Sequence, residues 1–242
     1  MKYPQKIALT FTVLFLFSSC TTTYYIPNTQ NVPAIHAKGA TAVNLAGNGN
    51  QVEFQAAYGL TDALAVQANG AWFIPHDEDN GNGGSGSLYE GGIGYYKNLS
   101  EHWLFDTYAL VGAGHLENHF PSTLPTDPAT TGRIEASALR YGLQPSITYH
   151  TPYFSVSGSV RGTQLSYSNI SGSLYLDGLS QQRYLADNSS NFLLEPALTL
   201  RGGSERLKLQ VQLMQSFNLS NSNFKQDKTL LSVGLSFSLG EK

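Results

Sequence analysis

The stretch Leu231-Ser232-Val233-Gly234-Leu235-Ser236-Phe237-Ser238-Leu239 places an apolar residue at every second position, with serine or glycine between. A β-strand turns successive side chains to opposite faces, so this stretch predicts a strand with one apolar and one polar face. The same alternation runs through 139–149 and 207–213. After Gly39 the chain has no apolar run long enough for a membrane-spanning helix. The sequence therefore predicts an all-β fold.

Alternation and turn residues together predict about ten strands in an up-and-down antiparallel transmembrane β-barrel. The predicted strands are 39–46, 51–58, 64–74, 88–97, 102–116, 134–149, 153–167, 191–201, 206–218 and 228–239. Tight turns near 59–62, 98–101, 150–152 and 202–205 alternate with longer connections at 75–87, 117–133, 168–190 and 219–227. The alternation is weaker in 88–97 and 102–116, which leaves an eight-stranded barrel with a folded-back hairpin as the alternative.

The strands of a soluble barrel would also alternate apolar and polar residues, so other features must decide between a soluble barrel and a membrane barrel. Aromatic residues gather at the predicted strand ends, as in the girdles of membrane barrels; they are Tyr58, Trp72, Tyr95, Trp103, Tyr149, Tyr153, Phe192, Phe217 and Phe237. The polar faces carry mostly Ser, Gly, Gln and Thr rather than the many charges of a water-exposed face. Strands of ten to fifteen residues also suit a tilted bilayer crossing better than a soluble sheet. These features favour the membrane barrel.

The N-terminus predicts export and lipidation. Lys2 and Lys6 precede the short apolar run 7–17, as in a secretory signal peptide. The small residues that follow lead to Cys20, the only cysteine in the chain, in a sequence that resembles a bacterial lipobox. We therefore expect a lipoprotein signal peptide at 1–19, with Cys20 lipidated as the mature N-terminus. An ordinary signal peptide is the alternative.

The rest of the predicted organisation follows from this start. Residues 20–38 are expected to form a lipidated periplasmic linker, in which Pro27 and Pro33 favour an extended path, and 39–242 to form the barrel. An even number of strands puts both ends of the barrel on the periplasmic side. No acidic residue directly follows Cys20, which resembles sorting signals for outer-membrane retention. The predicted location is the outer membrane, with the lipid anchor on its periplasmic side.

The chain resembles the small outer-membrane β-barrel proteins of Bacteroidota. The resemblance rests on 20–28 (Cys-Thr-Thr-Thr-Tyr-Tyr-Ile-Pro-Asn), on Asn31-Val32-Pro33, and on Tyr58-Gly59-Leu60-Thr61-Asp62 followed by 64–69 (Leu-Ala-Val-Gln-Ala-Asn). It implies a barrel fold and an outer-membrane location, and it transfers no catalytic residue.

The charged residues on the predicted inward faces balance each other. We expect a lumen polar network of Glu53, Glu90, Asp106 and Glu195 with Arg140, Arg161, Arg201 and Lys208. An unpaired charge in a confined lumen is costly, so mutual pairing of these acids and bases is expected. A ten-stranded barrel is barely wider than the eight-stranded size that side chains fill. The sequence therefore predicts a filled polar lumen rather than an open pore.

Two other clusters allow chemistry at the rim. His115, Glu117 and His119 share one face near the end of a strand, and the omptins, ten-stranded outer-membrane proteases, combine His and acidic residues at that rim. Loop residues Asp77, Glu78, Asp79 or Asp127 could supply the carboxylate that orients a histidine. No spacing marks a catalytic dyad, however, so we interpret the histidines and acidic residues of this rim as solvated loop residues. The 168–190 loop offers Tyr175, Asp177, Gln181, Gln182, Arg183 and Tyr184 for surface binding.

Composition excludes several classes of function. With 14 basic and 17 acidic residues among 242, the chain lacks the basic stripe of a nucleic-acid-binding protein. A single cysteine excludes an intrachain disulfide, and no cofactor or metal motif is found. The predicted function is a non-enzymatic structural or surface-binding outer-membrane lipoprotein, in contact with outer-membrane lipids and with an outer-membrane protein as a further partner. The alternatives are an accessory subunit of a larger outer-membrane complex and a rim-located omptin-like or lipid-modifying hydrolase.

Overall fold

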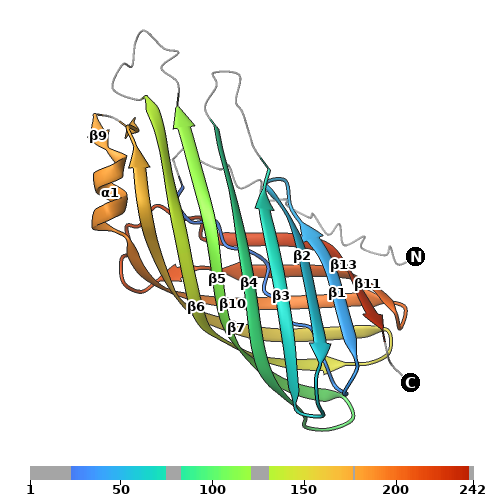
Figure 1. Cartoon of the computed structure of the whole chain (residues 1–242). Helices are drawn as coiled ribbons and strands as arrows, with labels where there is room; N and C mark the ends of the chain where they lie inside the picture. Colours follow the sequence, from blue (N-terminus) through green and yellow to red (C-terminus); the bar gives the residue numbers. More distant parts are fainter. Residues whose placement is uncertain (1–22, 75–82, 121–130, 177, 240–242) are drawn as a thin grey trace, which may run out of the picture.

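A computed structural model of the chain describes residues 23–74, 83–120, 131–176 and 178–239. Its elements, in chain order, are β1 (Thr41–Gly47), β2 (Gln51–Gly59), β3 (Leu64–Phe73), β4 (Gly83–Asn98), β5 (Trp103–Phe120), β6 (Gly132–His150), β7 (Phe154–Gly172), β8 (Tyr175–Leu176), β9 (Leu179–Ser180), α1 (Gln181–Asp187), β10 (Ser190–Gly203), β11 (Leu207–Gln215), β12 (Phe217–Asn218) and β13 (Thr229–Leu239). Consecutive wall strands pair antiparallel, as Figure 1 shows.

The wall is a closed ring. β1 pairs with β2 on one side and with β13 on the other, in the register Thr41↔Leu239 to Gly47↔Val233. β11 and β12, separated at Ser216, both pair with β10 and together form one wall strand. The predicted ten-stranded antiparallel barrel is therefore confirmed over the described residues, and the eight-stranded alternative is wrong.

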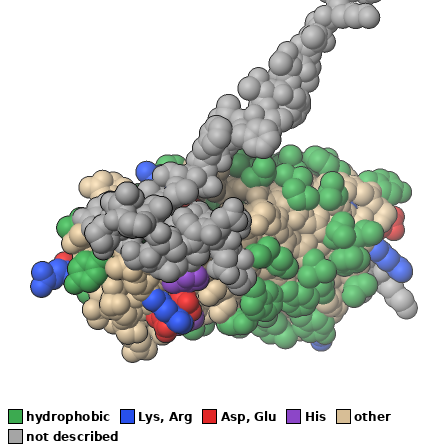
Figure 2. All heavy atoms as spheres, turned by 90° about the horizontal axis from the view of Figure 1, so that it is seen from above, with side chains coloured by type: hydrophobic (Ala, Val, Ile, Leu, Met, Phe, Trp, Pro, Cys, Tyr) green, Lys and Arg blue, Asp and Glu red, His purple; other side chains and the backbone are tan. Residues whose placement is uncertain are grey.

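The side-chain distribution is that of a soluble core turned inside out. On β13 the outward Leu231, Val233 and Leu235 are 57%, 51% and 43% exposed, whereas the inward Ser232 is 1% exposed. In the face shown in Figure 2, hydrophobic side chains cover much of the wall, and most charged side chains lie toward its ends. An apolar exterior around a polar interior matches a transmembrane barrel, because lipid and not water surrounds the wall. The described helix lacks the length and apolar character of a membrane-spanning helix.

Aromatic residues flank this apolar exterior. Of the nine predicted girdle residues, Tyr149 and Phe237 are half-buried and the other seven are exposed. Neighbouring rings contact each other on the surface: the Trp72 and Tyr89 rings lie edge to face at 5.8 Å, and the Trp72 Nε1–H donates to the Tyr89 hydroxyl at 2.9 Å. Such amphipathic rings suit the level of the lipid headgroups.

The barrel is taller on one side. β5, β6 and β7 have 18, 19 and 19 residues, whereas β1 has 7, and a membrane strand needs roughly 9–11. The long strands rise above the rest of the wall at the end with the longer connections, called here the long-loop end (Figure 1). The region 168–190, expected as a loop, instead contains the end of β7, the β8–β9 pair and α1. The Ser180 hydroxyl caps α1 by accepting from the Arg183 N–H.

The N-terminal segment does not follow the expected path. Residues 23–38, expected to form a periplasmic linker, run through the barrel interior from the long-loop end to the opposite end, called here the turn end (Figure 1). At the long-loop end the Tyr24 N–H donates to the Lys225 carbonyl at 2.9 Å, and at the turn end the Gly39 N–H donates to the Gly59 carbonyl at 2.8 Å. A Cβ on Gly59 would lie 2.3 Å from the Ala37 oxygen, so this passage needs glycine.

The direction of the segment corrects the predicted topology. The start of β1 and the end of β13 do lie at the turn end, as the even strand count requires. Thr23, however, lies at the long-loop end, where its carbonyl accepts from Asn118 at 3.2 Å. The physical reason is that the lumen has room for one extended segment, so residues 23–38 lie inside the barrel and not outside it. Residues 1–19 and Cys20 lie outside the described residues, as do Asp77, Glu78, Asp79, Asp127 and Asp177.

Candidate functional site: the lumen and its N-terminal plug

Residues 24–35, called here the plug segment, fill the lumen without pairing in the sheet. Five consecutive carbonyls of the segment accept hydrogen bonds from wall side chains instead. They are Pro27 from Gln51 (3.2 Å), Asn28 from Arg161 (3.1 Å), Thr29 from Gln55 (2.8 Å), Gln30 from Gln212 (3.0 Å) and Asn31 from Gln144 (2.7 Å). A buried backbone group must be hydrogen-bonded, and here the inward glutamines do what a neighbouring strand does elsewhere.

Gln30 lies at the centre of these contacts and is fully buried. Its N–H donates to Gln212 Oε1 at 2.7 Å, its side-chain amide donates to the Glu195 carbonyl at 2.6 Å, and its Oε1 accepts from the Ser159 hydroxyl at 2.7 Å. Gln30 thereby connects wall strands β7, β10 and β11 across the lumen. A side chain held at both its donor and acceptor ends fixes the depth of the segment in the barrel.

Apolar contacts hold the plug segment at the long-loop end. Tyr24 and Tyr25 pack in a cluster that contains residues from β6, β7 and β10, from α1, and from the connections after β7 and β12: Ile134, Ala136, Leu165, Tyr167, Leu174, Leu185, Leu193 and Phe224. The Tyr167 hydroxyl donates to the Tyr24 carbonyl at 2.6 Å. Burying a large apolar side chain contributes roughly 1.5–3 kcal/mol, so the two tyrosines anchor this end firmly.

A second apolar cluster holds the turn end. Ile35 of the plug segment packs with Ala40, Ala57, Ala65, Tyr96, Leu104, Tyr108 and Leu110. The last four lie on the inward face of β4 and β5, the strands whose alternation was weak in the sequence. Their apolar inward side chains have a partner because the plug segment lies against them. This was the available sequence signal for a plug, since an inward apolar residue needs something apolar inside the lumen.

Two of the four predicted acids form ion pairs with two of the four predicted bases. Arg140 Nη2 lies 2.6 Å from Glu90 Oε2, and Arg161 Nε lies 2.7 Å from Glu195 Oε2, all four side chains being buried. The Tyr25 hydroxyl joins the two pairs, because it donates to Glu195 at 2.7 Å and accepts from Arg140 at 3.1 Å. The plug segment therefore takes part in the charge network of the lumen.

The other four predicted charges do not pair with each other. Glu53 is buried and accepts from the Thr29 N–H (3.0 Å) and hydroxyl (2.8 Å). Asp106 accepts from the Ser146 hydroxyl. Arg201 donates to Gln210 Oε1 at 2.7 Å, and Lys208 donates to the Glu205 carbonyl at 3.4 Å. The expected pairing of all four acids with all four bases is thus wrong, because none of these four side chains lies within ion-pair distance of another of the predicted charges. Glu53 and Asp106 instead accept hydrogen bonds from wall and plug groups.

Burial shifts the ionisation of groups at the long-loop end, outside the membrane-spanning strands. Burial raises the pKa of the Tyr24 phenol, and the nearby Tyr184 raises it further. Burial also raises the pKa of Asp227, whose carboxylate accepts a 3.5 Å hydrogen bond from the Thr23 hydroxyl. These groups favour their neutral forms where the plug segment leaves the barrel.

The rim histidines do not form a catalytic arrangement with Glu117. Glu117 Oε2 lies 2.7 Å from Arg133 Nη2, which also lies 2.7 Å from Glu135 Oε1, and His119 Nδ1 lies 3.7 Å from Glu117 Oε1. Exposed His115 lies on the same face of β5. The structure therefore places Glu117 in a surface ion-pair cluster. No group of three metal-ligating side chains occurs among the residues that the structure describes.

The predicted surface-binding residues of 168–190 divide into two sets. Gln181 and Tyr184 belong to the plug anchor: Gln181 accepts from the Tyr24 hydroxyl at 3.0 Å, and the Tyr184 and Tyr24 ring centroids lie 5.7 Å apart. Tyr175, Gln182 and Arg183 are exposed. Among the described residues of the prediction, this second set is the one open to a partner.

The closed ring, the polar interior and the apolar exterior define the class of protein: a small transmembrane β-barrel of the outer-membrane type. No protein-family model and no curated protein matches the chain. Among solved structures, the KdgM porin is 8% identical over 83% of this chain and 99% of its own, with a TM-score of 0.36. The NanC porin is 11% identical over 84% and 99% (TM-score 0.36), and LpxR from Salmonella typhimurium is 7% identical over 84% and 100% (TM-score 0.35). Similarity at this level transfers no activity or ligand to this chain.

Proposed function

We propose that this protein is an outer-membrane lipoprotein whose barrel is closed by its own N-terminal segment, and that it acts as a non-enzymatic structural or surface-binding component. The hydrogen bonding of five consecutive plug carbonyls to the wall carries the proposal. A substrate passing through the lumen would have to break these contacts together with the apolar anchors at both ends. The barrel is therefore a scaffold and not a diffusion pore.

Conductance tests the closed lumen. The purified protein in planar bilayers is expected to show no stable current steps. A variant with Gly at Thr29, Gln30 and Asn31 loses the central side-chain contacts but keeps both anchors, and it should show intermittent openings. A variant with Ala at exposed Gln182 and Arg183 is the matched control and should stay closed. Large steady steps from the wild type would defeat the proposal.

The plug segment also bears on where a lipid anchor would lie. Cys20 precedes Thr23 by three residues, which span at most about 11 Å, and the apolar belt of such a barrel is about 25 Å tall. An acyl chain on Cys20 cannot reach the leaflet at the turn end. We therefore place the proposed anchor in the leaflet at the long-loop end, which faces the cell exterior in outer-membrane barrels.

Labelling distinguishes the two ends. In a Cys20→Ala background, Thr23→Cys should react with a membrane-impermeant maleimide on intact cells, and Lys38→Cys, at the turn end, should not. The reverse pattern would overturn the orientation. Incorporation of a lipid precursor, with Cys20→Ala as control, tests acylation separately; label retained by this variant would show that Cys20 is not the acylated residue.

The surface-binding part of the proposal concerns the tall side of the barrel. Tyr175 and Leu179 are 45% and 69% exposed beside α1, at the long-loop end. Elements that carry such residues beyond the bilayer suit contact with another molecule. An accessory role in a larger assembly remains a prediction from the sequence, and we propose no hydrolase at the rim because Glu117 is held by Arg133.

A further inference from the structure

Arg201 differs from the other two buried arginines of the lumen. Arg140 and Arg161 each contact a glutamate at 2.6–2.7 Å. Arg201 is 6% exposed, and its one hydrogen bond within the described part of the chain goes from Nε to the neutral amide oxygen of Gln210. Asp106 acts on it electrostatically but lies beyond ion-pair distance. A buried cation without an anion is costly, so this position calls for a negative partner.

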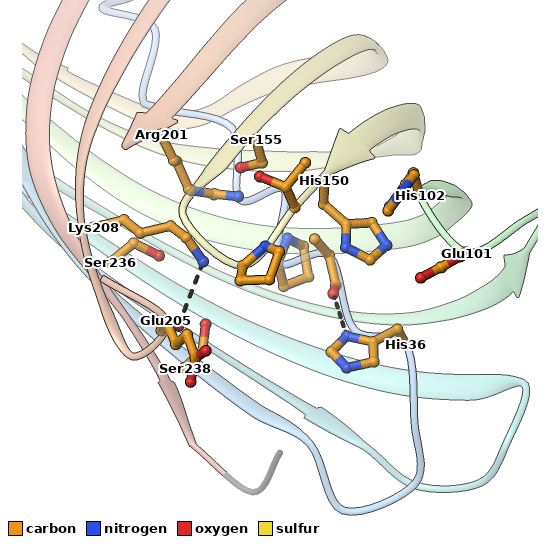
Figure 3. Close-up of a pocket in the computed structure, with 14 residues that line it drawn as sticks. His36, Glu101, His102, His150, Ser155, Arg201, Glu205, Lys208, Ser236 and Ser238 are labelled. Carbon is orange, nitrogen blue, oxygen red and sulfur yellow. Dashed lines mark hydrogen bonds between the residues drawn. The ribbon is translucent and has the colours of Figure 1, made fainter. Parts of the chain in front are cut away.

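The guanidinium of Arg201 borders a cavity of about 460 Å³, called here the turn-end cavity. Figure 3 shows Arg201, Ser155, Lys208 and Ser236 around it, with His150, His102 and His36 on the opposite side. Ser155 and Ser236 are buried, and both line the cavity. The cavity therefore offers cationic and hydroxyl donors together.

We propose that the turn-end cavity binds an oxyanion, a phosphate or carboxylate group carried by a small hydrophilic solute, with the Arg201 guanidinium as its main contact. The two free ends of a guanidinium match the paired oxygens of either group. Serine hydroxyls supply further donors, and Lys208 adds a second positive charge. The volume lies within the roughly 300–1,000 Å³ of small-molecule sites.

The acidic residues of the cavity do not cancel this charge at its inner end. Glu101 and Glu205 lie on exposed turns at its mouth, whereas Arg201 and Ser155 lie inside it. The cavity opens at the turn end, so its ligand would enter from the side opposite the long loops. The anion site involves no feature of Cys20. A negative result for anion binding is therefore distinguishable from a negative result for the lipid anchor.

Calorimetric titration of the purified barrel in detergent, at fixed ionic strength, tests the proposal with inorganic phosphate and acetate as probes. Saturable binding of either probe is expected, and the preferred probe identifies the group. Arg201→Gln should weaken binding by about tenfold or more, the effect of losing a charged hydrogen bond. Arg206→Gln, which makes the same charge change at an exposed position of the adjacent turn, should leave it unchanged.

Arg201→Gln should fold, because it removes a buried charge that has no carboxylate within ion-pair distance over the described ranges, so no salt bridge is broken. Lys208→Gln, at the half-buried edge of the cavity, provides a second variant and should weaken binding to a smaller extent. Absence of saturable binding in the wild type would overturn the proposal. Equal loss in Arg201→Gln and Arg206→Gln would do so as well, since it would indicate net charge and not a site.

Discussion

Glu195 is the residue on which wall and plug depend together. Its carboxylate pairs with Arg161 and accepts from the Tyr25 hydroxyl, while its main-chain carbonyl accepts from Gln30. Removing one partner of a buried pair leaves the other charge without compensation, which costs far more than losing an exposed pair.

Glu195→Gln is therefore expected to lower the free energy of unfolding by about 3–5 kcal/mol, because Arg161 is left buried without a carboxylate. Urea unfolding in phospholipid vesicles measures it. Glu117→Gln, which breaks the exposed pair with Arg133, is the matched control and should cost about 1 kcal/mol or less. Similar costs for both variants would contradict the buried network.

Asp227 gives the long-loop end a pH dependence. Burial raises the pKa of its carboxyl, so the folded state favours the protonated form. The stability that protonation contributes is complete below the ordinary pKa of an aspartate and is lost as pH rises through the raised pKa. An asparagine at this position mimics the neutral form at every pH. Asp227→Asn should therefore match the wild type near pH 3 and become the more stable of the two by about pH 7. Parallel unfolding midpoints for both proteins across this range would contradict it.

The plug segment is an element held by side chains rather than by sheet pairing. Its middle is polar and contacts inward amides, and its ends are apolar and contact the two clusters. The division follows the barrel itself, whose middle is lined by polar residues and whose ends contain inward Leu, Tyr and Ile. The element is extended because Pro27 and Pro33 disfavour helix.

Amide hydrogen exchange tests this element directly. In the wild type the Thr29 and Gln30 amides should exchange as slowly as those of the wall strands, since they donate to Glu53 and Gln212. Gln30→Ala removes the side-chain partner of Ser159 and of the Glu195 carbonyl, and each such group costs about 1–3 kcal/mol. Exchange at Thr29 should then rise by about tenfold or more, against no change in Gln182→Ala. Fast exchange in the wild type would mean that the plug is not held.

At the scale of the molecule, stability depends on the surroundings of the wall. The outward Leu143, Val111 and Val233 are 60%, 59% and 51% exposed, an arrangement that water would penalise and acyl chains favour. The middle of the interior is occupied mainly by amides, hydroxyls and charged side chains that include two ion pairs, and an apolar cluster lies at each end. Lipid around the wall and the plug segment in the lumen together stabilise a barrel with apolar side chains outside and polar side chains inside.

Val233→Arg places a charge near the middle of the apolar belt and should cost about 2–4 kcal/mol in vesicles. Leu179→Arg also replaces an exposed apolar residue, but at the long-loop end, outside the membrane, and it should cost almost nothing. Unfolding free energies measured in the same vesicles compare the two. A large cost for Leu179→Arg together with none for Val233→Arg would mean that the belt has been placed at the wrong height.

The sequence by itself determined the wall. Period-two alternation and turn residues are local signals, and they located the ten strands to within a few residues, apart from the extensions of β4, β5 and β7 at the long-loop end. Those extensions and α1 were missed because residues beyond the bilayer lose the strict alternation that lipid imposes, as in Gly83–Ser87.

Only the tertiary structure decided what fills the lumen. Nothing local to residues 24–35 distinguishes an extended linker outside the barrel from a plug within it, since both are extended and proline-containing. The choice depends on contacts more than a hundred residues away in sequence, such as Gln30 with Ser159 and Gln212. The same is true of the charges: Glu90 pairs with Arg140, and Arg201 donates to Gln210, because closure of the ring sets which inward side chains lie within reach.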